Sequence, residues 1–237
     1  MMLEHITMPE FKGSVKRRKT LVVPFGTIEA HGTHLPLHTD SLIISEVVKK
    51  ASEKTPVIVA PCVPFGVCTS TGAHPGTLGI TPGTLRRLVY DIVRDGAKKG
   101  FENFILISGH GGSLHVSALK EAGEGLVSEI EGINIAALSI YEVLGKDADG
   151  IRETKVDSHA GEIETSLVLY IAPTLVKGRA AEEYPRFQRP IISRDKVKRW
   201  PGAVWGDPGK ATREKGERMF NLMVQGVVSL VKKIEKT

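Results

Sequence analysis

The sequence is poor in cysteine, with only Cys62 and Cys68 among its 237 residues. Two cysteines do not make a disulfide framework, and their spacing does not match a zinc knuckle, so we expect two core or loop thiols. No apolar run reaches the roughly 18 residues that a membrane helix needs. The first twenty residues also lack the apolar stretch of a secretory signal peptide. These absences predict a cytosolic protein with no membrane partner.

A strong overall charge is also missing, because the net charge is only +5. The excess is uneven: residues 1–175 hold 17 Lys and Arg against 20 Asp and Glu, whereas residues 176–237 hold 15 against 7. Much of it lies in residues 186–199, RFQRPIISRDKVKR, which can meet a phosphate group or form a solvated or subunit-facing surface. No basic motif with interleaved aromatic residues and no recognised reader module accompanies it, so we expect no nucleic-acid partner.

What the sequence does contain is an alternation of short apolar runs with helical patterns. The expected strands are 20–25, 56–61, 101–108 and 133–140, and the expected helices are 41–50, 84–99, 113–131, 162–171 and 212–233. Short, wholly apolar strands between helices indicate an α/β fold with helices on both faces of a mainly parallel sheet. We therefore expect a single three-layer α/β/α domain over residues 1–237, with ligands bound at the carboxyl ends of the strands.

Three polar clusters follow the ends of predicted strands. GTIEAHGTHLPLHTD, residues 26–40, follows the first strand, and GHGGSLH, residues 109–115, follows the third. DSHAGEIETS, residues 157–166, comes after the fourth. Glu, Asp and His are the side chains that bind Zn, Mn or Fe in hydrolytic sites. The clusters therefore predict a metal centre that activates water.

Each cluster also has a simpler explanation. Asp40 could merely cap the helix that begins beside it, with Thr39 as the other candidate. His34 and His38 could be loop residues that face solvent, and His115 could lie on a helix surface. The glycines in residues 109–112 could form a tight turn or an anion-binding nest. Because three polar clusters coincide with three strand ends, we favour the metal centre.

The clusters also carry the pattern of a known family. E-x-H-G-x-H-L-P-x-x-x-D is met at residues 29–40, G-H-G-G at 109–112 and H-A-G-E-x-E-T-S at 159–166, with HPGT at 74–77 and VWGDP at 204–208. In this order the segments resemble the creatininase family of metal-dependent amidohydrolases. The resemblance implies an α/β/α fold, two divalent metal ions (Fe²⁺, Zn²⁺ or Mn²⁺) and hydrolysis of a C–N bond. It also implies a homo-oligomer of two to six subunits.

The resemblance further implies roles for individual residues, with Asp40 bridging the two ions. The expected metal ligands are Glu29, His31, Asp40, His110 and Glu164. The expected catalytic residues are Glu164 and His159, whose imidazole would move a proton to the leaving nitrogen. Substrate contacts are expected from His34, His74, Gly111, Gly112, Ser113 and Arg189.

Three positions depart from the members that hydrolyse creatinine. Those members carry Glu where this chain has Gly112, Glu where it has Ser158, and Trp where it has Lys155. The departures put creatinine in doubt as the substrate. They also weaken the expected second metal site.

Our leading hypothesis is the deformylation of a formamidopyrimidine ribonucleotide in riboflavin and deazaflavin biosynthesis. The substrate's phosphate could bind the basic segment, since Arg is well shaped for phosphate. The residues concerned are Arg186, Arg189, Arg194, Lys196 and Arg199. Alternatives within the family are a creatinine amidohydrolase and a peptidase that releases a small peptide. A non-catalytic binder with a degenerate centre is the alternative from another class, whereas a serine hydrolase is disfavoured because no G-x-S-x-G elbow exists.

Overall fold

The computed structural model describes residues 1–187, 190–194 and 196–237. Four strands form one parallel sheet in the order β2-β1-β3-β4. They are β1 (Thr20–Phe25), β2 (Ile58–Val59), β3 (Asn103–Ser108) and β4 (Asn134–Ser139). The predicted parallel sheet is confirmed, and each strand lies within one of the predicted apolar runs. Arg189, a predicted substrate contact, falls outside the described residues.

The register of the sheet brings the strand ends together at one edge. Phe25 at the end of β1 pairs with Ser108 at the end of β3, and Ser108 pairs with Ser139 at the end of β4. The N–H of Gly109 then donates to the carbonyl oxygen of Phe25 at 2.8 Å. The segments that follow β1, β3 and β4 therefore start side by side, at the edge where parallel sheets bind ligands.

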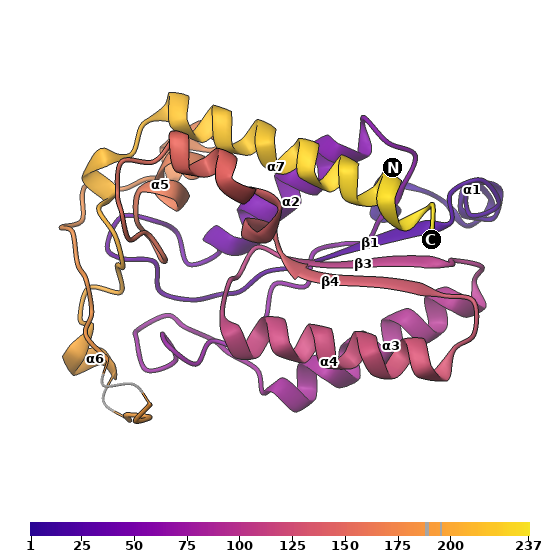
Figure 1. The fold of residues 1–237 in the computed structure, drawn as a ribbon, viewed down its shortest axis with the longest axis horizontal. Helices are drawn as coiled ribbons and strands as arrows, with labels where there is room; N and C mark the ends of the chain where they lie inside the picture. Colours follow the sequence, from indigo (N-terminus) through magenta and orange to yellow (C-terminus); the bar gives the residue numbers. More distant parts are fainter. Residues whose placement is uncertain (188–189, 195) are drawn as a thin grey trace.

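Helices cover both faces of the sheet, which confirms the three-layer α/β/α arrangement (Figure 1). One face carries α2 (Thr39–Ser52), α5 (Glu162–Ile171) and α7 (Arg213–Ile234), and the other carries α3 (Pro82–Lys98) and α4 (Ser113–Glu129). The shorter helices are α1 (Met8–Ser14) and α6 (Lys196–Arg199), with the 3-10 helices η1 (Leu3–His5), η2 (Ile140–Val143), η3 (Gly145–Gly150), η4 (Pro173–Leu175) and η5 (Pro208–Lys210).

The strands bury both of their faces because successive side chains point to opposite layers. Val22 and Ile105 belong to the core shared with α2, α5 and α7. Leu21 and Phe104 belong to the core shared with α3 and α4. Burying one such side chain stabilises the fold by about 1.5–3 kcal/mol. The sheet is thus held between two apolar cores, and its edge loops rest on a rigid base.

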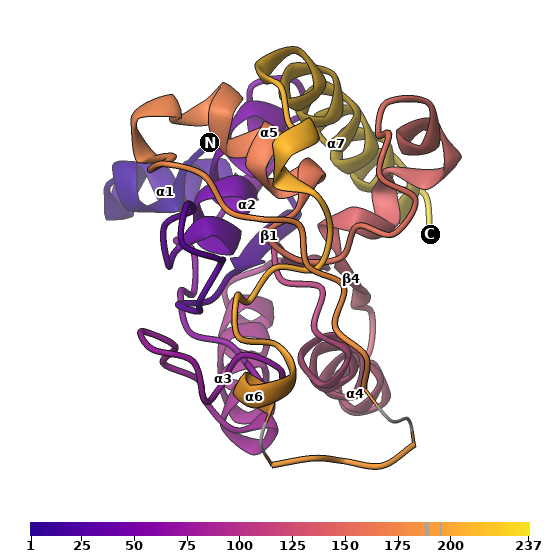
Figure 2. The same ribbon diagram turned by 90° about the vertical axis from the view of Figure 1, so that its left-hand side faces the viewer.

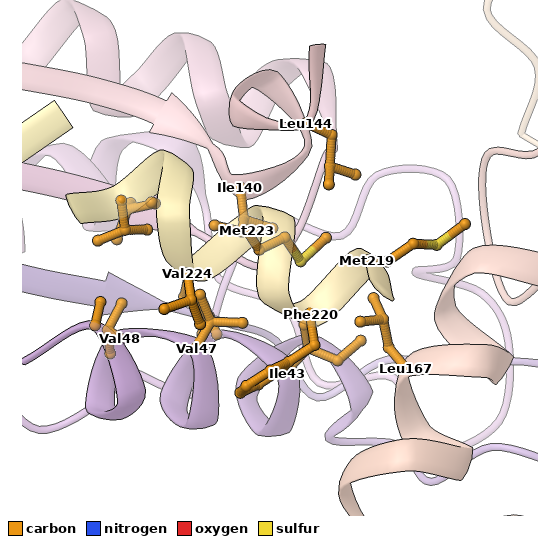
Figure 3. Close-up of a cluster of buried hydrophobic side chains, with 14 of the residues drawn as sticks. Ile43, Val47, Val48, Ile140, Leu144, Leu167, Met219, Phe220, Met223 and Val224 are labelled. Atoms are coloured by element: carbon orange, nitrogen blue, oxygen red, sulfur yellow. The ribbon is translucent and has the colours of Figure 1, made fainter. Parts of the chain in front are cut away.

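The core nearest the Asp40 segment lies where α7 packs against α2 (Figure 3). Ile43 and Val47 of α2 are fully buried and lie beside Phe220 and Val224 of α7. Asp40 precedes Ile43 by three residues, so it occupies the first turn of the same helix. This packing therefore fixes the position of the Asp40 side chain.

Two features of the N-terminal region differ from the prediction. β2 spans only Ile58–Val59 rather than 56–61, because Pro56 and Pro61 have no N–H to donate to the ladder. The outer side of β2 pairs with Met2, which covers this edge of the sheet. α1 was not predicted, although Thr7 and Glu10 form a capping box at its start.

Residues 172–209 were predicted to be irregular, and they contain only short helices among the described residues. Figure 2 shows this segment, drawn in orange, crossing the side of the molecule where the loops after the strands emerge. None of the described helices is both long and apolar enough to span a membrane.

Candidate metal centre

The five predicted metal ligands come together at the carboxyl edge of the sheet. The segment after β1 supplies three of them, the segment after β3 supplies His110, and the first turn of α5 supplies Glu164. All five are buried, at 8% exposure or less. Three carboxylates and two imidazoles in so small a buried space need opposite charge, which a bound cation can supply.

Asp40 lies at the middle of this cluster. Its Oδ1 is 3.3 Å from Nε2 of His31, and its Oδ2 is 3.2 Å from Nδ1 of His110. The hydroxyl of Thr27 donates to the same Oδ2 at 2.5 Å. His38 holds the N-cap position of α2, so the simpler explanation of Asp40 as a helix cap is wrong. Its two oxygens instead point to two different groups of ligands.

The first group lies around Glu29 and His110. Oε1 of Glu29 is 2.6 Å from Nδ1 of His110, and its other oxygen accepts a hydrogen bond from the hydroxyl of Thr71. The ligand atoms of Glu29, His110 and Cys68 all lie within 4.8 Å of one another. Cys68 was expected as a core or loop thiol, and the structure places it at the centre. It follows β2, whose carboxyl end lies at the same edge, and this was the signal available in the sequence.

The second group consists of His31, Asp40 and Glu164, whose ligand atoms also lie within 4.8 Å of one another. Nδ1 of His31 donates to the backbone carbonyl oxygen of Glu29 at 3.1 Å, so Nε2 is the ring nitrogen that faces Asp40 and Glu164. Nε2 is buried and has no hydrogen-bond partner. A buried imidazole nitrogen between two carboxylates fits a divalent cation, so the residues present fit the implied metal.

Gly112 does not leave the second group short of a carboxylate. Glu164 Oε2 lies 3.7 Å from Nε2 of His31, which places a carboxylate beside His31 and Asp40 without a glutamate at position 112. A Cβ at position 112 would lie 2.2 Å from Nε2 of His110, so a side chain there would displace the imidazole. The glycine is therefore needed for this orientation of His110, and any substrate contact at Gly112 must come from its backbone.

The pKa values show how strongly the charges are coupled. Burial lowers the pKa of His31, but Asp40, Glu164 and Glu29 outweigh it and raise that pKa to about 10. Burial raises the pKa of Asp40, but His31 and His110 hold it well below its usual range. The centre thus favours two positive charges against its carboxylates, and bound cations would take the place of the two protons.

His159 stands beside the second group. Its Nε2–H donates to the carbonyl oxygen of Ala30 at 2.8 Å, and its ring centroid is 4.3 Å from that of His31. Burial and the charge of His31 lower the pKa of His159, which favours the neutral ring. Because Nε2 carries the proton, Nδ1 is the nitrogen free to accept one.

Two of the family-like segments hold these residues in place. The hydroxyl of Thr77, in HPGT, accepts the N–H of Ala30 at 3.0 Å. The backbone of Trp205, in VWGDP, exchanges hydrogen bonds with that of His159, because the N–H of each residue donates to the carbonyl oxygen of the other. The side chain of Trp200 also packs against the His159 ring, with centroids 5.2 Å apart. These contacts give both segments a structural role at the centre.

A cavity of about 620 Å³ opens beside the centre, and His159 and Glu164 are among the residues that line it. The hydroxyl of Tyr141, on its wall, donates to Oε1 of Glu164 at 2.8 Å. Two predicted substrate contacts, Gly111 and Ser113, line this cavity. The cavity is therefore the place where a substrate can approach both the ligands and His159.

Two other predicted substrate contacts, His34 and His74, do not line the cavity. His34 is buried, with Nε2 2.8 Å from the hydroxyl of Thr165 on α5. Nε2 of His74 donates to the carbonyl oxygen of Trp200 at 2.6 Å. Both imidazoles therefore join separate segments of the chain instead of lining the cavity. His38 is half-buried and His115 is fully buried, so His115 does not lie on a helix surface.

The basic segment does not reach the cavity either. None of its described residues lines the cavity walls, and Lys196 instead donates to the carbonyl oxygen of Thr69 at 2.5 Å. The cations on the walls are Lys120 of α4 and Arg152, which follows η3. Sequence reasoning missed both, because a single basic residue on a helix or in a turn gives no signal of its own.

Comparison with known proteins agrees with this geometry. A family model described as creatininase, creatinine amidohydrolase, matches residues 4–231. The mycofactocin precursor peptide peptidase of Mycolicibacterium smegmatis is 29% identical over 252 residues, covering 97% of this chain and 93% of the relative. The creatinine amidohydrolase of Pseudomonas putida is 27% identical, covering 90% of this chain and 88% of the relative.

A solved structure of creatininase with Mn superimposes with a TM-score of 0.85 and 25% identity, covering 98% of this chain and 97% of that one. The sheet, the buried ligand groups and these relatives support a hydrolase that acts on C–N bonds and uses divalent metal. Since the family model spans nearly the whole sequence, this chain belongs to the creatininase family.

Proposed function

We propose that the protein hydrolyses a non-peptide C–N amide bond of a small molecule with two divalent metal ions. The observation that supports this most is the position of Asp40, with one oxygen beside His31 and the other beside His110. Glu29 and Glu164 complete one ligand group on each side. Divalent ions bound there supply Lewis acidity and lower the pKa of water.

The protein's own proton carrier in this proposal is His159. Nδ1 of its neutral ring accepts a proton from the attacking water and passes it to the leaving nitrogen. The hydrogen bond from its Nε2 to Ala30 keeps the ring in the required tautomer. The hydroxyl of Tyr141 holds the Glu164 carboxylate in orientation beside it. A non-catalytic binder would need no such imidazole on the wall of the cavity.

The substrate we propose is a formamidopyrimidine ribonucleotide, which loses formate in riboflavin and deazaflavin biosynthesis. A cavity of about 620 Å³ is in the size range of small-molecule sites. Lys120 and Arg152 on its walls supply cations for the phosphate, in place of the basic segment. Lys120 pairs with Glu142 at 3.2 Å, and Arg152 pairs with Asp149 at 2.7 Å. Because ion pairs near the surface are weak, the two cations can leave these carboxylates and bind a phosphate instead.

Release of a small peptide is the second candidate. It is favoured by the similarity to the mycofactocin precursor peptide peptidase over 97% of this chain. Creatinine is less suitable, because a small neutral ring has no use for the two cations on the cavity walls. All three reactions would use the same ligands and the same His159.

The test is to supply the metal-loaded protein with each of the three substrates. Protein purified without oxygen and loaded with Fe²⁺, Zn²⁺ or Mn²⁺ should release formate from the ribonucleotide. It should act poorly on creatinine and on short peptides. Release of creatine or of a peptide, with no formate under any metal, would replace the proposed substrate but keep the hydrolytic centre.

We also propose that the protein is a cytosolic homo-oligomer of two to six subunits. Ile191 and Ile192 are 69% and 91% exposed, and adjacent exposed isoleucines favour a subunit contact. Light scattering coupled to size-exclusion chromatography gives the subunit number. A monomer at working concentrations would contradict this part of the proposal.

A further inference from the structure

We propose that Cys68 is a ligand of the ion held by Glu29 and His110, so that one half of the centre is a thiolate site. The Sγ of Cys68 lies within 4.8 Å of the ligand atoms of Glu29 and His110, which are themselves 2.6 Å apart. Because a Zn–S bond is about 2.3 Å long, ligand atoms at these separations can bind one ion after small movements of the side chains. Binding forms one bond from Sγ to the ion and releases the thiol proton to solvent.

The loop that carries Cys68 is anchored on both sides of it. The N–H of Val67 donates to Nδ1 of His115 at 3.1 Å, and the hydroxyl of Thr71 donates to Glu29. The N–H of Ile80 donates to the carbonyl oxygen of Gly66 at 2.9 Å, which closes the loop. These contacts of the fold therefore hold Cys68 beside Glu29 and His110.

The thiol of Cys68 makes a long hydrogen bond that a bound ion would replace. Cys68 is buried, and its Sγ–H donates to the carbonyl oxygen of Gly66 at 3.6 Å. An independent sign that the centre takes cations is the buried, unpartnered Nε2 of His31 in the adjoining group. Cys62 differs, because it is half-buried and belongs to none of the ligand groups among the described residues.

The inference predicts that the two halves of the centre select different metals. A sulfur donor favours softer ions such as Zn²⁺ over Mn²⁺. His31, Asp40 and Glu164 offer only nitrogen and oxygen, and they have no such preference for Zn²⁺. We expect replacement of Cys68 by Ser to weaken the binding of one Zn²⁺ by about tenfold or more and to affect Mn²⁺ much less.

The test uses Co²⁺ as a coloured probe in wild-type protein, C62S and C68S. In C62S the only remaining thiol is Cys68, so a thiolate-to-cobalt charge-transfer band in the near ultraviolet assigns the ligand directly. We expect the band in wild-type protein and C62S, and its loss in C68S. Because C62S alone is decisive, the test does not depend on the folding of C68S.

The inference rests on the metal centre of the proposed function, but its readout is a spectrum rather than turnover. C62S that binds Co²⁺ without a thiolate band would overturn the role of Cys68 and leave the hydrolytic centre intact. Wild-type protein that binds no Co²⁺ at all would contradict the centre itself. If the charge-transfer band persists in C68S, the band comes from a group other than Cys68, and this result would also overturn the inference.

Discussion

At the scale of single residues, the account depends on the shared carboxylate of Asp40. Its two oxygens face different imidazoles at 3.3 and 3.2 Å, so its removal affects both ligand groups. Glu164 belongs to only one group. The two acids should therefore respond differently to the loss of charge.

We expect Asp40→Asn to lower the affinity for both ions and Glu164→Gln to lower it for one. Loss of an outer partner alone costs about 10- to 100-fold in metal affinity, so loss of the shared ligand should cost at least about 100-fold. Metal analysis after dialysis measures the ions per chain. Asp149→Asn, on the cavity wall, is the control and should keep both ions; equal losses in D40N and E164Q would contradict a bridging Asp40.

His159→Ala should keep the metal and lose turnover. Its ring lies beside the ligands but donates to Ala30, so its proposed task is proton transfer. General acid–base catalysis contributes about 10²–10⁴-fold, and kcat should fall by that factor. The exposed His5→Ala is the matched control. A variant that loses its ions would instead make His159 a metal ligand, as its position near Glu29 and His31 permits.

At the scale of elements, α5 and α7 are joined by an ion pair near the centre. Nζ of Lys215 on α7 donates to Oε1 of Glu162 on α5 at 2.6 Å. The same carboxylate accepts the N–H groups of Glu153 and Thr154. Glu162 lies two residues before Glu164 and is fully buried. This contact therefore holds the turn that carries Glu164.

Lys215→Met should destabilise the protein because it leaves the buried Glu162 charge without its cation. Breaking a buried pair costs about 3–5 kcal/mol, and the remaining N–H donors place the expected loss at about 3 kcal/mol. Urea unfolding measures the free energy of unfolding. Lys50→Met, which breaks an exposed pair with Glu53, is the control and should change little. If both substitutions lowered the free energy of unfolding equally, the ion pair between α5 and α7 would be no stronger than an exposed pair.

The ion pair of Glu162 and Lys215 also predicts part of the loss of stability in acid. Burial raises the pKa of Glu162, but Lys215 and the N–H groups of Thr154 and Glu153 lower it from 4.5 to about 2. A pKa lowered by folding contributes stability above pH 4.5, and this contribution is lost as the pH falls toward 2. Glu162→Gln should flatten the fall of stability in this window. An unchanged slope in acid unfolding would contradict the lowered pKa.

Element prediction succeeded where the pattern was local. The apolar run of β1 ends at Phe25 and polar residues follow, so its bounds were predicted correctly. The β2 prediction was too long, because proline at both ends of the run limits the ladder. A metal centre was predicted because three polar segments follow strand ends, whereas the individual ligands were predicted from the resemblance to the family. Cys68 was missed, since its nearness to Glu29 depends on the path of a loop after β2.

At the scale of the whole molecule, the distribution of charge was the poorest guide to the site. The basic segment holds most of the excess positive charge of residues 176–237, yet its described residues do not line the cavity. Lys120 and Arg152 come from separate segments of the chain, and both line the same cavity in the folded structure. Composition shows that charge is present, but the topology decides which charges face a substrate.

Arg152→Gln should therefore raise the KM for the phosphorylated substrate and leave its dephosphorylated form unaffected. The loss of one charged contact to phosphate corresponds to about tenfold or more in kcat/KM. Kinetics on the nucleotide and the nucleoside measure the difference. Arg194→Gln, in the basic segment, is the control. A larger effect in R194Q than in R152Q would return the phosphate to the basic segment.

The central claim is that two ions lie on either side of Asp40. Anomalous diffraction from crystals grown with Mn²⁺ or Zn²⁺ tests it most directly. We expect two peaks about 3.5–4 Å apart, one beside Glu29 and His110 and the other beside His31 and Glu164. A single peak, or two peaks that do not share Asp40, would contradict the two-metal centre.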